Sequence, residues 1–166
     1  MGKILNHTLI AISIALLSLI TACGDEGCIE PIVSYTLADF QQIGTDRGNA
    51  ITSVSFYAIA YKTDSTMVDS LMVTTQSQKL NGIPLILNPQ SDSTRLRVLM
   101  NIRGLEVTDT LTFFYTQSPY FISFDCGCTT HYTIKDVHHT NNLIQEITII
   151  NPNVTNEKKP NISIRY

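Results

Sequence analysis

The residue types best suited to chemistry lie close together in the second half of the chain. Cys126 and Cys128 flank one glycine, and His131 follows three residues later. Thiolates and imidazoles are preferred ligands of zinc and copper, and neighbouring thiols also exchange disulfides. A metal-binding or thiol-redox protein would use these three side chains. The four-ligand spacing of a structural zinc site is absent from the sequence, so we expect no metal or cofactor and keep this function as the alternative.

A different kind of cysteine chemistry is indicated at the N-terminus. The apolar run from Thr8 to Ile20 is shorter than the roughly 20 residues that a membrane-spanning helix needs, and it suits a signal peptide. It ends in Ile20-Thr21-Ala22-Cys23, which resembles the lipobox of bacterial lipoproteins. That resemblance implies a lipoprotein signal peptide over residues 1–22, acyl chains such as palmitate on Cys23, and an acidic tether over residues 23–30. The alternative is an ordinary secretory signal, cut near the same point without lipid.

A series of short motifs in the rest of the chain also resembles a known family. The series is SDST at 91–94, DTLTF at 109–113, PYFIS at 119–123, CG at 126–127 and ITIIN at 147–151, after an early cysteine, Cys28. It is similar to that of small Bacteroidetes-type lipoproteins that carry one domain of unknown function. Cys128 has no counterpart in that pattern. The resemblance implies a protein of the bacterial outer membrane, held by membrane lipid through Cys23 and facing the periplasm or the cell surface.

Export would place the three remaining cysteines in an oxidising compartment, where thiols pair by default. We expect a disulfide between Cys28 and Cys126, with Cys28–Cys128 as the near alternative. A bridge between Cys126 and Cys128 would be strained, because only one residue separates them.

One further pattern indicates a modification. Asp followed by Ser or Thr and then by an apolar residue or Thr occurs four times, and this resembles the O-glycosylation acceptor of Bacteroidetes envelope proteins. The acceptor hydroxyls would be those of Ser65, Ser70, Ser93 and Thr110, the last of them on the outward face of an expected strand. Asp-Ser pairs also initiate turns, which is the structural alternative.

Strand patterns dominate the elements that must position these residues. Residues 95–102 alternate, with Leu96, Val98, Met100 and Ile102 on one face, and in residues 108–116 Leu111, Phe113 and Tyr115 do the same. Further strands are expected at 32–37, 54–61, 68–75, 120–124, 132–137, 143–150 and 161–166. Turn signals separate them at 46–49, 81–82, 88–89, 103–104, 118–119 and 151–153, and the one helical turn expected is residues 37–42. These patterns predict one all-β domain over residues 31–166, an immunoglobulin-like β-sandwich of about eight or nine strands.

The composition and the absence of known catalytic motifs exclude several classes of function. A net charge of −3 gives no basic surface for nucleic acid. The sequence lacks the motifs of serine hydrolases, phosphate-binding loops and metalloproteases. The aromatic residues mostly follow strand patterns, so we expect them in the core, with Tyr35 or Tyr132 as the exceptions that would bind a glycan. We therefore expect a non-catalytic binding or structural module whose partner is an envelope protein or a glycan. A hydrolase with a dispersed active site is the weakest alternative.

Overall fold

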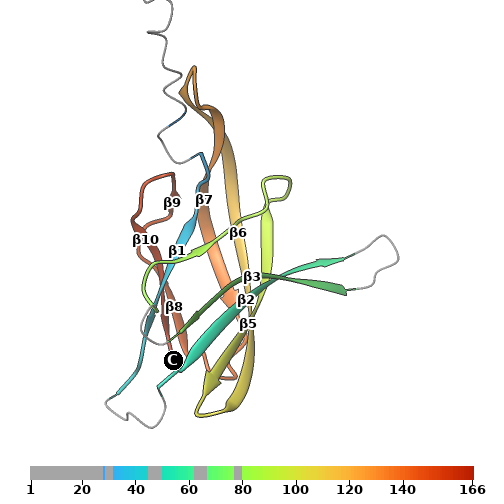
Figure 1. Cartoon of the computed structure of the whole chain (residues 1–166), viewed down its shortest axis with the longest axis vertical. Helices are drawn as coiled ribbons and strands as arrows, with labels where there is room; N and C mark the ends of the chain where they lie inside the picture. The colour runs from blue at the N-terminus through green and yellow to red at the C-terminus, as the bar shows by residue number, and fades with distance from the viewer. Residues whose placement is uncertain (1–27, 29–31, 45–49, 62–66, 77–79) are drawn as a thin grey trace, which may run out of the picture. The chain divides into compact units, whose positions relative to one another are not determined.

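The computed structural model describes residue 28 and residues 32–44, 50–61, 67–76 and 80–166 (Figure 1). The chain divides into two units, Met1–Glu30 and Pro31–Tyr166, and the fold described below is that of the second unit. Among the described residues there are ten strands and no helix, so the predicted all-β class is confirmed. Accordingly, no helix in this part of the chain is long and apolar enough to cross a membrane.

The ten strands form two sheets. In chain order they are β1 (Thr36–Gln41), β2 (Ser53–Tyr61), β3 (Met67–Gln76), β4 (Ile83–Leu85), β5 (Ser93–Ile102), β6 (Leu105–Ser123), β7 (Gly127–His139), β8 (Glu146–Ile149), β9 (Asn153–Val154) and β10 (Pro160–Arg165). One sheet has the order β4-β1-β10-β8 and the other has the order β3-β2-β5-β6-β7-β9. The first and last strands, β1 and β10, pair in parallel, and Figure 1 shows them side by side.

The core lies between the inward faces of the two sheets. The alternation predicted for β5 is confirmed, because Leu96, Val98 and Met100 are fully buried. The smaller sheet contributes side chains from β1 and β10 to the same cluster. The ring of Phe40 on β1 meets that of Phe56 on β2 edge to face, with centroids 6.1 Å apart. This contact joins one sheet to the other and gives the packing of a β-sandwich.

The helical turn expected at residues 37–42 is wrong, because most of this segment is strand β1. Thr36, Ala38 and Phe40 are buried in turn while the residues between them are half-buried, which is the two-residue period of a strand. β1 also has hydrogen-bonded neighbours on both sides, β4 and β10. Pairing with distant strands therefore outweighs the local helical preference of this sequence.

The turn expected at residues 118–119 is also wrong. Both residues lie within β6, which is a single strand of 19 residues rather than two shorter ones. β5 pairs with β6 only as far as Phe114, so Pro119 lies where β7 is the one described strand beside it. A strand with an open edge tolerates proline, because the missing N–H removes no bond on that side.

The turn expected at residues 103–104 is confirmed. Ile102 pairs with Leu105, and the two residues between them connect β5 to β6. Arg103 has a φ of 52° and Gly104 has a φ of 86°, the left-handed conformations of a two-residue type I′ hairpin turn. The turn signal at residues 46–49 lies outside the described residues.

A buried carboxylate joins β6 to the loop that follows β7. Asp109 is 1% exposed and points to the core side of β6. Its Oδ1 accepts hydrogen bonds from the hydroxyl of Thr140 at 2.6 Å and from the backbone N–H of Asn142 at 2.8 Å. Its Oδ2 accepts from the backbone N–H groups of Leu143 at 2.8 Å and Ile144 at 2.9 Å. Four donors therefore satisfy a charge that would otherwise be costly to bury.

Two tyrosines form the last core layer, near the middle of β6. The rings of Tyr115 and Tyr132 meet edge to face, with centroids 5.3 Å apart. The Tyr115 hydroxyl donates to the carbonyl of Asn88 at 2.8 Å, and the Asn88 N–H donates to the hydroxyl of Thr94 at 2.8 Å. The Thr94 and Tyr115 hydroxyls lie 2.7 Å apart, which closes a ring of three hydrogen bonds. Beyond this layer β6 and β7 leave the sandwich.

Candidate functional site

The β6–β7 hairpin projects past the rest of the described fold. β5 begins opposite Phe114, and β9 reaches β7 only at Tyr132 and Thr133. From Thr116 to Ser123, β6 therefore pairs with β7 alone among the described strands. Figure 1 shows this hairpin, in yellow and orange, extending beyond the ends of the neighbouring strands. Residues 116–121 of this outer part are exposed, on both faces of the strand.

Three aromatic side chains at the end of this hairpin are exposed, and we call them the aromatic tip. Tyr120 is 46% exposed, Phe121 is 50% exposed and Phe124 is 97% exposed. The rings of Phe121 and Phe124 meet edge to face with centroids 5.3 Å apart. Phe121 and Phe124 form an exposed apolar pair, and Tyr120 lies on the opposite face of the same end of the hairpin. Exposed apolar side chains gathered at one end of a molecule are typical of a contact with a partner or a membrane.

Two of the cysteines, Cys126 and Cys128, lie at the same end of the hairpin. Cys28 and Cys126 are each disulfide-bonded, so the structure contains a disulfide bond. Cys128 is exposed and is the free cysteine among the described residues. The backbone N–H of Cys126 donates to the Ser123 hydroxyl at 3.1 Å, and Gly127 takes a φ of 73° that favours glycine. These two features set the turn that leads from β6 into β7.

The structure does not bring Cys126, Cys128 and His131 together as metal ligands. Cys128 pairs with Phe121 and His131 pairs with Ser118, which places the two on opposite faces of the hairpin. Instead, the His131 ring stacks on that of Tyr120, with centroids 4.1 Å apart and planes 16° from parallel. The described residues contain no group of three His, Cys, Asp or Glu side chains arranged to hold a metal ion.

The proposed acceptor hydroxyls lie in different settings. Ser70 is exposed on β3, and its neighbour Asp69 forms an ion pair of 2.6 Å with Arg97. Ser93 and Thr110 are half-buried on β5 and β6. Ser65 lies outside the described residues. Ser70 is therefore the most accessible acceptor in the described part of the chain.

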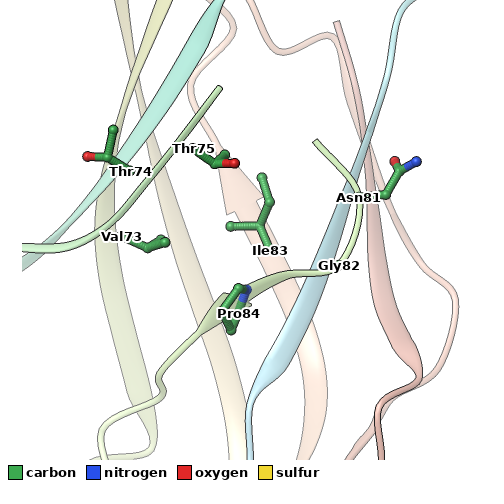
Figure 2. Close-up of a pocket in the computed structure, with 7 residues that line it drawn as sticks. All are labelled: Val73, Thr74, Thr75, Asn81, Gly82, Ile83 and Pro84. Atoms are coloured by element: carbon green, nitrogen blue, oxygen red, sulfur yellow. The ribbon is translucent and has the colours of Figure 1, made fainter. Parts of the chain in front are cut away.

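Two of the hollows in the described part of the chain share Asn81, Gly82 and Pro84 in their lining. Figure 2 shows the smaller one, of about 350 Å³, between Val73, Thr74 and Thr75 of β3 and the segment from Asn81 to Pro84. None of the side chains that line it is titratable, so it offers no acid, base or charged ligand.

The larger hollow is a cleft of about 740 Å³ over β1, β4 and the start of β10. Its lining residues are Tyr35, Leu37, Asp39, Asn81, Gly82, Pro84, Lys158 and Pro160. The one carboxylate, Asp39, accepts a hydrogen bond of 2.6 Å from the backbone N–H of Gly82. Ring and proline faces beside a few polar groups suit the binding of a small ligand, and no nucleophile with a neighbouring base lines the cleft.

Comparison with protein families finds a family model that matches the chain. The model of the Family of unknown function (DUF6452) matches residues 53–166. The chain belongs to this family. The DUF6452 match begins at the first residue of β2 and therefore includes Asp109, the aromatic tip, Cys126 and Cys128. Comparisons with the curated proteins and with the solved structures find no match.

Two features of the DUF6452 domain were not predicted from the sequence. They are the buried carboxylate of Asp109 and the exposed aromatic tip. Asp109 alternates with Leu111 and Phe113, so the strand pattern already placed a carboxylate on the core side of β6. The exposed aromatic residues of the tip correct the expectation that most aromatic residues are in the core. Of the two exceptions expected, Tyr132 is buried, whereas Tyr35 is partly exposed and lines the larger cleft.

Proposed function

We propose that this protein is a lipid-anchored lipoprotein of the bacterial outer membrane and that its DUF6452 domain is a non-catalytic binding module. The observation that carries the proposal is the disulfide-bonded state of Cys28 and Cys126. Structural disulfides persist in oxidising compartments, so this state supports export of the chain. In an exported chain, the lipobox-like segment Ile20-Thr21-Ala22-Cys23 directs acylation of Cys23.

We infer that Cys28 and Cys126 are bonded to each other. Cys128 is a free thiol, and in the proposed lipoprotein the Cys23 thiol carries lipid, so no other cysteine of the chain is available to either. The bond closes a loop of about a hundred residues, for which the chain-entropy estimate is about 4.7 kcal/mol. It also attaches the tether to the end of the hairpin.

The partner we propose for the module is a glycan or an envelope protein bound at the larger cleft. Tyr35, Pro84 and Pro160 offer apolar faces there, while Asp39 and Lys158 offer opposite charges. Rings and prolines beside a few polar groups bind a sugar or a short peptide without chemistry. We expect Tyr35→Ala to lose binding of the sugar or peptide. The exposed control Leu105→Ala should bind it as the wild type does.

The anchor is tested first, with the full chain made in a bacterium that processes lipoproteins. We expect the wild type and Cys128→Ala to sediment with membranes and to yield an acylated peptide that begins at Cys23. Cys23→Ala lacks the thiol that would be acylated, and firm anchoring needs two or more acyl chains. We therefore expect this variant in the soluble envelope fraction. A mature chain whose Cys23 thiol is free and alkylates readily would contradict the proposal.

Glycosylation at Asp-Ser and Asp-Thr sites is a separate proposal, supported by the exposure of Ser70. We expect protein from its own host to be heavier than its sequence and acyl chains require. Replacing Ser70 with alanine should lower that excess mass, with Ser65, Ser93 and Thr110 as the remaining acceptors. An unmodified mass would contradict the proposal.

A further inference from the structure

We propose that the aromatic tip of the hairpin lies in the lipid–water interface of the membrane that holds the Cys23 anchor. This inference rests on the proposed function, because it requires the acylated cysteine. It adds a second, non-covalent contact between the DUF6452 domain and the bilayer, made by Tyr120, Phe121 and Phe124.

The side chains of the tip suit that position. The Phe121 and Phe124 rings contact each other and are exposed, so they carry apolar area that the sandwich leaves uncovered. Tyr120 stacks one face on His131 and keeps a hydroxyl for water or lipid headgroups. Aromatic rings of this kind gather at the level of the headgroups, where one end is apolar and the other is wet.

Chain length places the tip near the bilayer. Cys28 follows Cys23 by five positions, and a chain segment of that length spans at most about 18 Å. If Cys28 is bonded to Cys126, the acyl chains are held within that reach of the hairpin turn. Phe124 is two residues from Cys126, so the most exposed ring of the tip is also one of the closest to the anchor.

The charge of the hairpin indicates that its contact with lipid does not depend on anionic headgroups. No Lys or Arg occurs between Gly104 and Lys135, and Asp125 is exposed beside Phe124. The tip therefore offers no cation to anionic headgroups, and its contact is apolar and shallow. We expect the same insertion into vesicles of phosphatidylethanolamine and phosphatidylcholine with or without phosphatidylglycerol.

The test uses tryptophan fluorescence, because the chain has no native Trp. Phe124→Trp places a tip probe, and Leu105→Trp places a matched control probe at the opposite end of β6, where the native side chain is 66% exposed. The acylated variants are reconstituted into vesicles that contain brominated lipids. We expect the lipids to quench the tip probe several-fold more strongly than the control probe. Aqueous iodide should show the reverse order and quench the control probe more strongly.

The other outcomes separate this inference from the proposed function. If iodide quenches both probes equally, in protein that sediments with vesicles and carries acyl chains, the tip contact is overturned and the anchor stays intact. A tip probe shielded from both quenchers overturns the contact in favour of a protein partner. Absence of acyl chains overturns the proposed function itself. Reduction of the disulfide after reconstitution should lower quenching of the tip probe by lipid while the acyl chains keep the protein on the vesicles.

Discussion

The Thr140 hydroxyl donates a hydrogen bond of 2.6 Å to the carboxylate of Asp109, which lies 31 residues earlier in the chain. The same hydroxyl accepts a bond of 2.9 Å from the backbone N–H of Thr110. Together with the three backbone N–H groups that donate to Asp109, this contact ties the end of β7 and the loop after it to the first third of β6. These bonds fix the β6–β7 pair inside the sandwich, at the end away from the projecting part of the hairpin.

Replacing Asp109 with asparagine should destabilise the domain strongly. The amide keeps one acceptor oxygen and brings two N–H groups, so at least two of the four donors around it lose their partner. We expect a loss of about 2–4 kcal/mol in the free energy of unfolding, measured by urea denaturation. Glu106→Gln, at an exposed position on the same strand, is the control and should change little. Equal stability of the two variants would contradict the structural role of Asp109.

The same carboxylate makes stability depend on pH in the acid range. Burial raises the pKa of Asp109, but the hydrogen bonds from Thr140 and from the backbone of 142–144 outweigh that effect and hold it below the usual 3.8. The unfolded state therefore binds the proton more tightly, and the stabilisation is present above about pH 4 and is lost as the pH falls through the folded pKa. The urea midpoint of the wild type should decrease as the pH drops below 4, and that of Asp109→Asn should decrease less steeply.

Tyr115→Phe should weaken the layer from which the hairpin projects. Loss of the hydroxyl leaves the Asn88 carbonyl and the Thr94 hydroxyl each without one partner, which costs about 1–2 kcal/mol. Tyr57→Phe, a change on the outward face of β2, is the control. A midpoint for Tyr115→Phe that matches the control would show that the ring of three hydrogen bonds contributes nothing.

Burial also raises the pKa of the Tyr115 and Tyr132 phenols above the usual 10.0. The folded state favours the neutral phenol, so this stabilisation is full below pH 10 and is lost as the pH rises through the folded pKa. In a spectrophotometric titration of the wild type, we expect two of the seven tyrosines to ionise late, above the usual 10.0. Tyr115→Phe should remove one of these two late steps.

Peptide mapping without reduction should recover one Cys28–Cys126 peptide. Cys128 is exposed and free, so a thiol reagent should label it once in the native protein, and Cys128→Ser should abolish the label. Recovery of Cys28–Cys128 alone would contradict the inferred pairing in favour of the near alternative. Recovery of both peptides would mean that the thiol at 128 exchanges with the neighbouring disulfide. That outcome would favour the thiol-redox alternative built on Cys126, Cys128 and His131.

Local patterns in the sequence determined the fold class and much of the strand layout. Strict alternation in β5 and in the first half of β6 gave the buried face, because side chains of a strand point to opposite sides whatever packs against them. Arg103-Gly104 marked its turn, since a two-residue hairpin needs left-handed conformations. The segment at 37–42 was misjudged because its strand depends on β4 and β10, which are distant in sequence.

Only the tertiary structure decided which aromatic residues are buried. Tyr115 and Phe121 both lie on β6, yet the first is in the core and the second is half exposed. Alternation states which face of a strand a side chain takes, but burial also requires another layer opposite that face. That layer ends at Tyr115 and Tyr132, and the hairpin continues beyond it. The exposed end of the hairpin, where Cys126 and the aromatic tip meet, is therefore a property of the packed sandwich and not of the strand pattern.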